Sequence, residues 1–270
     1  MFHAAGLARG RAVAALIGPS GTGKSTAARI LCREDFDYVT DETVAVKPDG
    51  FVTPFPKPIA YLPAEGGGKR EVGPDELGLR TCNDQLELGG LVLMNREADR
   101  LEPQVDPLDL LRGMVALIPH MSALPHLPAP LNALAQIVEA CGGVFHVTYS
   151  EAHQLGEVVR SALSAKPCSG GVVHHPASEP VRGAGTVRAA YTDAIELEGE
   201  VLVLRNSDCL LLSGIGGLIW LAANEPRELD ALEQRVVSVT GPHPDSAELV
   251  RAAVEELRAL GVLQVGPDVS

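Results

Sequence analysis

The sequence predicts an α/β domain with a parallel sheet, followed by a smaller α+β unit. An apolar run at residues 13–17 leads into a glycine-rich segment at 18–26 and then into a helix-like stretch, as in strand–loop–helix units. Strand-like and helix-like stretches continue to alternate as far as residue 164, which is typical of parallel α/β sheets. The following stretch, 166–186, is rich in Pro, Gly, Ser and Ala and shows no periodicity, as is typical of a linker.

We therefore expect a first domain over residues 1–165, a linker over 166–186 and a second domain over 187–266. A chain of 270 residues is long enough for such a division. A hydrophobic fraction of 46% is sufficient for packed cores and argues against global disorder.

The charge balance and the cysteines narrow the classes of partner. A net charge of −13 argues against general affinity for nucleic acid or for an anionic membrane. No apolar stretch reaches the roughly 18 residues of a membrane span, and the N-terminus lacks the apolar core of a signal peptide. The five cysteines lack C-x-x-C spacing, which suits reduced thiols and gives no metal site. We expect a cytoplasmic protein without nucleic-acid or membrane partners.

The elements of the first domain follow from its apolar periodicity. After the glycine-rich segment we expect a helix over 26–33, a strand over 37–41, a turn and a further strand to residue 46. Residues 48–80 are rich in Pro and Gly and predict a long surface excursion that could order over a ligand. Beyond it we expect a strand over 91–94, helices over 107–117 and 130–140, a strand over 144–149 and a helix over 151–164.

The second domain is predicted to begin with strands and to end with helices. Three short strands are expected over 189–197, 200–205 and 208–212, separated by turns. An apolar helix over 214–223 carries Trp220, and amphipathic helices are expected over 226–237 and 245–260. Gly261 stands where a helix C-cap belongs, before a last strand over 262–265.

The glycine-rich segment fits G-x-x-x-x-G-K-[ST], the phosphate-binding loop. Its residues are Gly18, Pro19, Ser20, Gly21, Thr22, Gly23, Lys24, Ser25 and Thr26. Glycines let the backbone wrap so that successive N–H groups point at phosphate oxygens, and the helix start adds partial positive charge. Lys24 should reach the β- and γ-phosphates and Ser25 should hold Mg²⁺. We therefore expect ATP and Mg²⁺ to bind here; Lys69 and Arg70, farther along, could touch phosphates or lie in a solvated loop.

Phosphoryl transfer also needs a group that orients the nucleophile and a metal ligand. Asp41 and Glu42, at a predicted strand end, are the candidates. One carboxylate could accept the proton of an attacking hydroxyl, while its neighbour binds the metal directly or through water. An acidic pair that merely caps a turn is the alternative, and the residues alone leave both open.

The segments from His3 to Thr26 and from Phe36 to Val44 resemble the core of the bacterial HPr serine kinase/phosphorylase family. The resemblance covers roughly residues 1–165 and implies catalytic roles for His3, Lys24 and Asp41, with Asp41 as the base that takes the seryl proton. Glu42 replaces the second Asp of the family's pair, as a metal ligand. The segment 86–90 resembles the family's Leu-Glu-Ile-Arg-Gly, which implies that Glu87 helps to bind Mg²⁺.

Residues 187–266 resemble PqqD, the small winged-helix-like domain that binds peptides in ribosomal peptide modification pathways. The segments that carry the resemblance are 199–206, 214–220, 226–232 and 254–263. Such domains take the leader of a precursor peptide as an added strand. An accessory domain that stabilises the kinase, or a dimerisation module, is the alternative.

Together the resemblances imply an ATP-dependent kinase that phosphorylates a Ser or Thr hydroxyl of a ribosomally made precursor peptide, for example of a lasso peptide. The leader of that peptide would be held by residues 187–266. A nucleotide-gated peptide chaperone without phosphotransfer, or a small-molecule kinase, is the alternative. HPr kinases form hexamers, so a homo-oligomer is left open as well.

Overall fold

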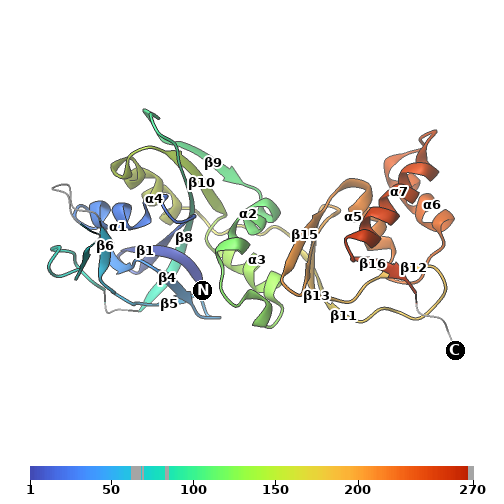
Figure 1. Ribbon diagram of the computed structural model, residues 1–270, viewed down its shortest axis with the longest axis horizontal. Coiled ribbons are helices and arrows are strands. Elements are labelled where there is room, and N and C mark those ends of the chain that lie inside the picture. The colour runs from blue at the N-terminus through green and yellow to red at the C-terminus, as the bar shows by residue number, and fades with distance from the viewer. Residues whose placement is uncertain (62–67, 69, 83–84, 267–270) are drawn as a thin grey trace. The chain divides into compact units, whose positions relative to one another are not determined.

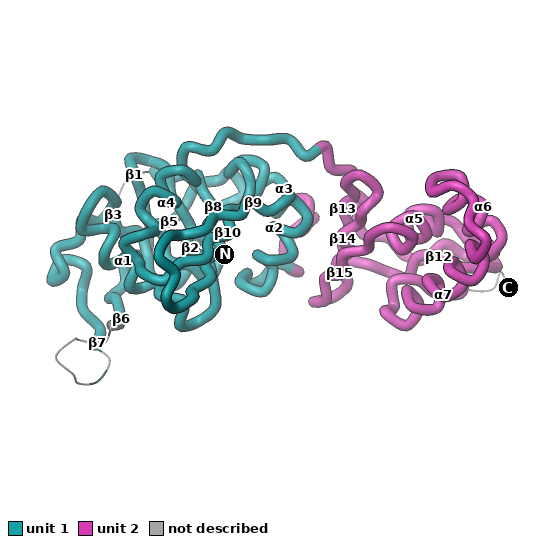
Figure 2. Tube along the Cα trace, turned by 90° about the horizontal axis from the view of Figure 1, so that it is seen from above, with its two compact units in different colours: residues 1–124, 134–170 teal, residues 125–133, 171–270 magenta. Residues whose placement is uncertain are grey.

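This mixed α/β chain divides into two compact units (Figure 2), and each has its own hydrophobic core. The computed structural model describes residues 1–61, 68, 70–82 and 85–266. Unit 1 comprises residues 1–124 and 134–170, and unit 2 comprises 125–133 and 171–270. Among the described helices, none has the length and apolar character needed to cross a membrane.

Unit 1 is built on a mixed sheet with helices packed against it (Figure 1). Its strands are β1 (Phe2–Arg9), β2 (Ala12–Ile17), β3 (Asp37–Thr40), β4 (Thr43–Val46), β5 (Phe51–Thr53), β6 (Ile59–Tyr61), β7 (Arg70–Val72), β8 (Leu86–Arg96), β9 (Gln104–Leu108) and β10 (Val144–Tyr149). Its helical segments are α1 (Lys24–Leu31), α2 (Leu110–Leu117), η1 (Ile118–His120), η3 (Ala152–Gln154) and α4 (Leu155–Leu163). Helix α3 (Pro130–Ala140) and the 3-10 turn η2 (Leu124–His126) have residues in both units.

Five strands of unit 1 close into a small mixed barrel in the order β2–β1–β4–β5–β8, because β8 also pairs with β2. Strands β10 and β9 extend the sheet from β8, and β3 joins the edge of β1. Among the described strands of this sheet, only the β2–β8 and β8–β10 pairs are parallel. The prediction of a parallel sheet is therefore wrong for most of unit 1, since short turns such as the one between β1 and β2 can join only antiparallel neighbours.

Strands β3 and β4 run one after the other along the same edge of β1. Gly6 of β1 pairs with Thr40, His3 pairs with Thr43, and the register shifts between Gly6 and Leu7. The backbone of Ala4 donates to Glu42 O between the two pairings (3.1 Å). The step between β3 and β4 is thus an irregularity within one edge and not a hairpin turn.

Unit 2 has an antiparallel sheet covered by three helices around Trp220, which is fully buried. Its elements are β11 (Val173–Ser178), β12 (Thr186–Arg188), β13 (Tyr191–Leu197), β14 (Glu200–Arg205), β15 (Asp208–Leu212), α5 (Gly214–Ala222), α6 (Leu229–Thr240), α7 (Ser246–Ala259) and β16 (Leu263–Val265). The sheet order is β11–β13–β14–β15, and β12 pairs with β16 as a separate ribbon. The three predicted strands, the three helices and the last strand are confirmed to within a few residues.

Part of the expected linker over 166–186 is a strand, which corrects that prediction. Strand β11 pairs with β13, and His174 on it bonds the fully buried carboxylate of Asp193 (2.7 Å). Pro176 makes this segment atypical of a strand in the sequence. The proline is tolerated because β11 is an edge strand.

In unit 1 the structure differs from the sequence-based predictions in three places. The alanine-rich strand β1 was not predicted, because alanine has low β propensity. The helix expected over 107–117 begins at Leu110, capped by Asp109, whose side chain accepts from Arg112 N (3.0 Å), and the residues before it form β9. The excursion over 48–80 contains β5, β6 and β7; Arg70 on β7 is exposed, and Lys69 lies outside the described residues.

Two neighbouring glycines of α5 give a matched test of the packing in unit 2. A Cβ on Gly217 would lie 3.1 Å from Leu212 O and closer still to Gly199 O, whereas one on Gly216 meets only Leu257 Cδ2 at 3.9 Å. We predict that Gly217→Ala lowers the free energy of unfolding by about 1–3 kcal/mol. Gly216→Ala should raise it by about 0.5 kcal/mol, because alanine favours helix. Urea unfolding measures both, and equal effects would contradict the described packing.

Candidate active site

Strand register brings most of the predicted site residues, Glu87 excepted, to one end of the strands in unit 1. Ile17, the last residue of β2, pairs with Ala4 near the start of β1 and with Leu93 near the end of β8. Thr40, the last residue of β3, pairs with Gly6 of β1. The loop after β2, the acidic pair after β3 and the start of β1 therefore lie at the same end of these strands.

The loop that follows β2 needs glycine at two kinds of position. A Cβ on Gly18 would lie 2.9 Å from Met94 O and 3.0 Å from Thr22 Oγ1, so the strand exit leaves no room for a side chain. Gly21 and Gly23 both have φ of +89°, in the left-handed region that glycine favours. The motif glycines are thus required by the backbone path, as the sequence predicted.

Hydrogen bonds hold the loop in shape from within and from β10. Thr22 Oγ1 donates to Pro19 O (2.8 Å). The hydroxyl of Tyr149, the last residue of β10, donates to Thr22 O. Both contacts fix the loop backbone at its tip, which leaves the N–H groups at the start of α1 available for a ligand.

Lys24 places its ammonium inside the loop. Its side chain is only 8% exposed, and Nζ donates to Gly18 O (2.7 Å) and Pro19 O (3.0 Å). Burial lowers the pKa of Lys24, and the nearby Asp41 carboxylate opposes that shift. A positive charge therefore lies at the start of α1, where the helix end already favours anions.

Asp41 lies beside Ser25 and Lys24, so the structure brings these three predicted residues together. Burial raises the pKa of Asp41, while the hydrogen bond with Ser25 and the charge of Lys24 oppose the rise. Asp41 Oδ1 is buried and has no hydrogen-bond partner among the described residues. An unpaired buried carboxylate oxygen is costly, and such atoms are common where a ligand completes the hydrogen bonding.

Glu42 is exposed and is paired with Lys57, a residue that the sequence did not single out. The hydrogen bond from Lys57 holds the pKa of Glu42 below its ordinary value. Lys57 is positioned by Tyr38, whose hydroxyl donates to Lys57 O (2.8 Å). Glu42 is therefore next to the site but already has a cationic partner.

His3 is exposed on β1, opposite Thr43 and close enough to Glu42 to act on its charge. A second histidine, His120, lies nearby in η1 and was not predicted as a site residue. Burial lowers the pKa of His120, and the charges of Lys24 and His3 lower it further. No motif marks His120 in the sequence, because its place depends on a contact between distant parts of the chain.

Glu87 does not reach the loop, which corrects its predicted role as a metal ligand. It pairs with Ala12 at the start of β2, and its carboxylate bonds Arg11 Nη2 (2.9 Å). The loop leaves the other end of β2, about 17 Å along a six-residue strand. The parallel register of β2 and β8 fixes this separation.

The donor set fits magnesium better than a metal held by protein ligands alone. Within the described residues no group of three or more His, Cys, Asp or Glu could hold a metal ion. Mg²⁺ commonly needs only one or two protein oxygens besides substrate phosphates and water. The Ser25 hydroxyl and the unpaired Oδ1 of Asp41 are such oxygens.

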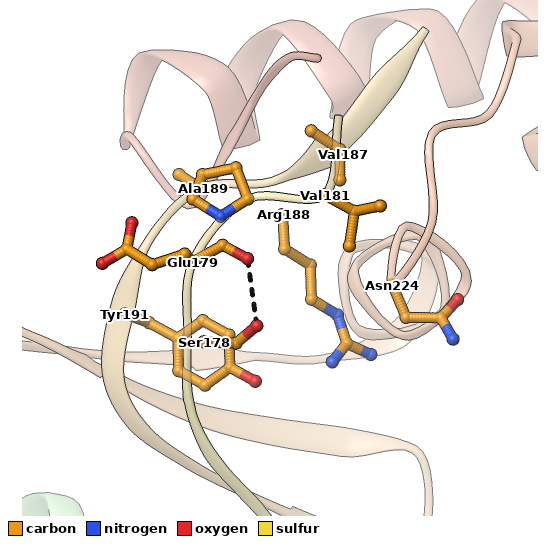
Figure 3. A pocket seen from close by; sticks show the side chains of 9 residues that line it. Ser178, Glu179, Val181, Val187, Arg188, Ala189, Tyr191 and Asn224 are labelled. Carbon is orange, nitrogen blue, oxygen red and sulfur yellow. Dashed lines mark hydrogen bonds between the residues drawn. The ribbon is translucent and has the colours of Figure 1, made fainter. Parts of the chain in front are cut away.

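A small pocket of about 130 Å³ lies in unit 2 beside Arg188 (Figure 3). The guanidinium of Arg188 stacks 3.7 Å from the centre of the Trp220 ring and donates to Trp220 O (2.8 Å) and Leu221 O (3.0 Å). These carbonyls belong to the last turn of α5, where a cation is stabilising. Arg188 is therefore accounted for as a helix cap.

Comparison with known protein families, with characterised proteins and with solved structures gave no match to this chain. The function proposed below therefore rests on the geometry of unit 1 and on the sequence patterns of both units. Both the sequence motif and the geometry support one part of the candidate site. It consists of the loop, with Lys24 and Ser25, and of Asp41 beside it.

Asp41→Asn tests the electrostatic account of the site. Because burial raises the pKa of Asp41 in the folded chain, its charged form reduces stability. We predict that Asn raises the free energy of unfolding by about 1 kcal/mol at pH 8. The cost of the charge is present above the folded-state pKa and disappears as pH falls towards 3.8, so the advantage of Asn should shrink on acidification.

Urea unfolding between pH 8 and pH 4.5 measures this dependence. Asp75→Asn is the control, because Asp75 is exposed and its substitution should change stability by less than about 0.5 kcal/mol. A lower stability of Asp41→Asn at pH 8 would mean that Ser25 and Lys24 outweigh the burial.

Proposed function

We propose that this chain is an ATP-dependent kinase that phosphorylates a Ser or Thr hydroxyl of a ribosomally made precursor peptide in the cytoplasm. The observation that carries the proposal is the meeting of Lys24, Ser25 and Asp41 at the end of a phosphate-binding loop. A loop with only a lysine and a serine would support nucleotide binding. The half-buried carboxylate of Asp41 beside them supports transfer to a hydroxyl as well.

The loop geometry supports the proposed nucleotide binding. The β- and γ-phosphates would accept hydrogen bonds from the backbone N–H groups of residues 21–26 at the start of α1. Lys24 would exchange its bonds to Gly18 O and Pro19 O for bonds to phosphate oxygens. The ammonium is already buried in the loop, so little rearrangement is needed.

Phosphoryl transfer then requires an acceptor oxygen on the Asp41 side of the terminal phosphate. The peptide hydroxyl oxygen bonds to the γ-phosphorus as the bond to the β–γ bridging oxygen breaks, and ADP leaves with that oxygen. The hydroxyl proton passes to Asp41, whose pKa burial raises toward that of a useful base. Ser25 lies beside the carboxylate and stabilises its charged form.

Mg²⁺, when bound, neutralises charge on the β- and γ-phosphates. Ser25 is the residue that would hold it, which leaves the unpaired Oδ1 of Asp41 free to take the hydroxyl proton. Glu42 would contribute only after releasing Lys57. His3 remains a proposed catalytic residue at the same edge of the sheet.

Two finer fold assignments are part of the proposal. Unit 1 would be an HPr kinase-like domain, supported by its loop and by Asp41 after β3. Unit 2 would be a PqqD-like winged-helix domain, supported by three antiparallel strands followed by three helices. Its edge strands, β11 and β15, offer backbone groups to which a leader peptide could add as a further strand.

Lys24→Ala and Asp41→Asn separate binding from transfer. Each variant is incubated with ATP, Mg²⁺ and synthetic precursor peptides encoded beside its gene, and the peptides are weighed by mass spectrometry. The wild-type chain should add one phosphoryl group to a Ser or Thr. Lys24→Ala should lose ATP binding and transfer, whereas Asp41→Asn should keep ATP binding and lose about 1,000-fold in rate.

Lys47→Ala is the control, because Lys47 is an exposed lysine in the β4–β5 turn. Full transfer by Asp41→Asn would refute the assigned base. Binding of ATP and peptide by the wild-type chain without any gain in mass would refute the kinase and favour a nucleotide-gated peptide chaperone.

A further inference from the structure

The short helical turn η1 lies beside the start of β1. Phe2 forms a β-bridge with Met121, and Ser122 N donates to Met1 O (3.0 Å). The chain therefore returns, after α2, to the edge of the sheet where the loop leaves β2. His120, directly before the bridge, is brought to this edge by backbone contacts.

The environment of His120 contains the residues of the candidate site. Its imidazole is partly buried and lies near enough to Lys24 and His3 for both charges to disfavour its protonation. Lys24 in turn lies inside the loop, bonded to Gly18 O. His120 and Lys24 thus belong to one electrostatic cluster, together with His3.

A terminal phosphate at the loop would need donors beyond the loop itself. The backbone N–H groups and Lys24 serve the β-phosphate and part of the γ-phosphate. Asp41, on the other side, is an acceptor when ionised and cannot donate to phosphate oxygens. A neutral imidazole carries one N–H donor, which suits an oxygen of the γ-phosphate.

We infer that His120 is a further nucleotide-binding residue, which donates a hydrogen bond to the terminal phosphate of a nucleoside triphosphate held by the loop. The inference rests on the nucleotide-binding part of the proposed function and not on the peptide acceptor. It assigns His120 the discrimination between a nucleoside triphosphate and a diphosphate. A diphosphate lacks the phosphate group that His120 contacts. The affinity for a diphosphate should therefore not change when His120 is substituted.

Isothermal titration calorimetry with Mg²⁺ and either AMP-PNP or ADP tests the assignment on the full chain. His120→Gln should weaken AMP-PNP binding about tenfold and ADP binding less than twofold, since one hydrogen bond to a charged group is lost only in the triphosphate complex. His126→Gln is the matched control, because His126 is an exposed histidine six residues further along. It should change neither affinity.

Equal weakening of both nucleotides, or no change in either, would overturn the assignment. Where His120→Gln does not fold, carbethoxylation of the wild-type chain by diethyl pyrocarbonate replaces it, with His120 followed by peptide mass spectrometry. AMP-PNP should protect His120 and ADP should not; equal protection overturns the inference. Failure of the proposed kinase is distinguishable, because a chain that binds AMP-PNP through His120 but phosphorylates no peptide would refute only the transfer step.

Discussion

The parallel pairing of β2 with β8 is the constraint on which the rest of unit 1 depends. It closes the five-stranded barrel, since β2 pairs with β1 and β8 pairs with β5 at the two ends of the antiparallel series β1–β4–β5. It brings the exit of β2 against Met94, so that residue 18 has no space for a Cβ and the chain must turn at once into the loop. The sharp turn into the loop is therefore a consequence of how the barrel closes.

The same closure explains why the candidate site residues lie together at one end of the strands of unit 1. Strands β3 and β4 pair one after the other with the same edge of β1, and the break between them leaves Asp41 half-buried beside Ser25, outside any strand. Ser25 and Lys24 offset part of the cost of burying this carboxylate, and the oxygen that stays unpaired is of the kind found at functional sites.

Local pattern was sufficient to predict the loop, most helices and the strands β13 to β15, because their periodicity and turn residues are short-range signals. Pairing between distant segments carries no such signal. Only His120 was missed for this reason, since a bridge between Phe2 and Met121 brings it to the site; the alanine-rich β1 was missed because alanine has low β propensity. Glu87 shows the converse: its motif matched, but the register places it at the wrong end of β2.

The central claim is that the loop holds a nucleoside triphosphate with its terminal phosphate between Lys24 and Asp41. A crystal structure of the chain with Mg²⁺ and AMP-PNP tests it most directly. The account predicts β- and γ-phosphates on the backbone of residues 21–26, with Lys24 Nζ moved from Gly18 O to the phosphate oxygens. A nucleotide bound elsewhere, or a γ-phosphate that points away from Asp41, would contradict it.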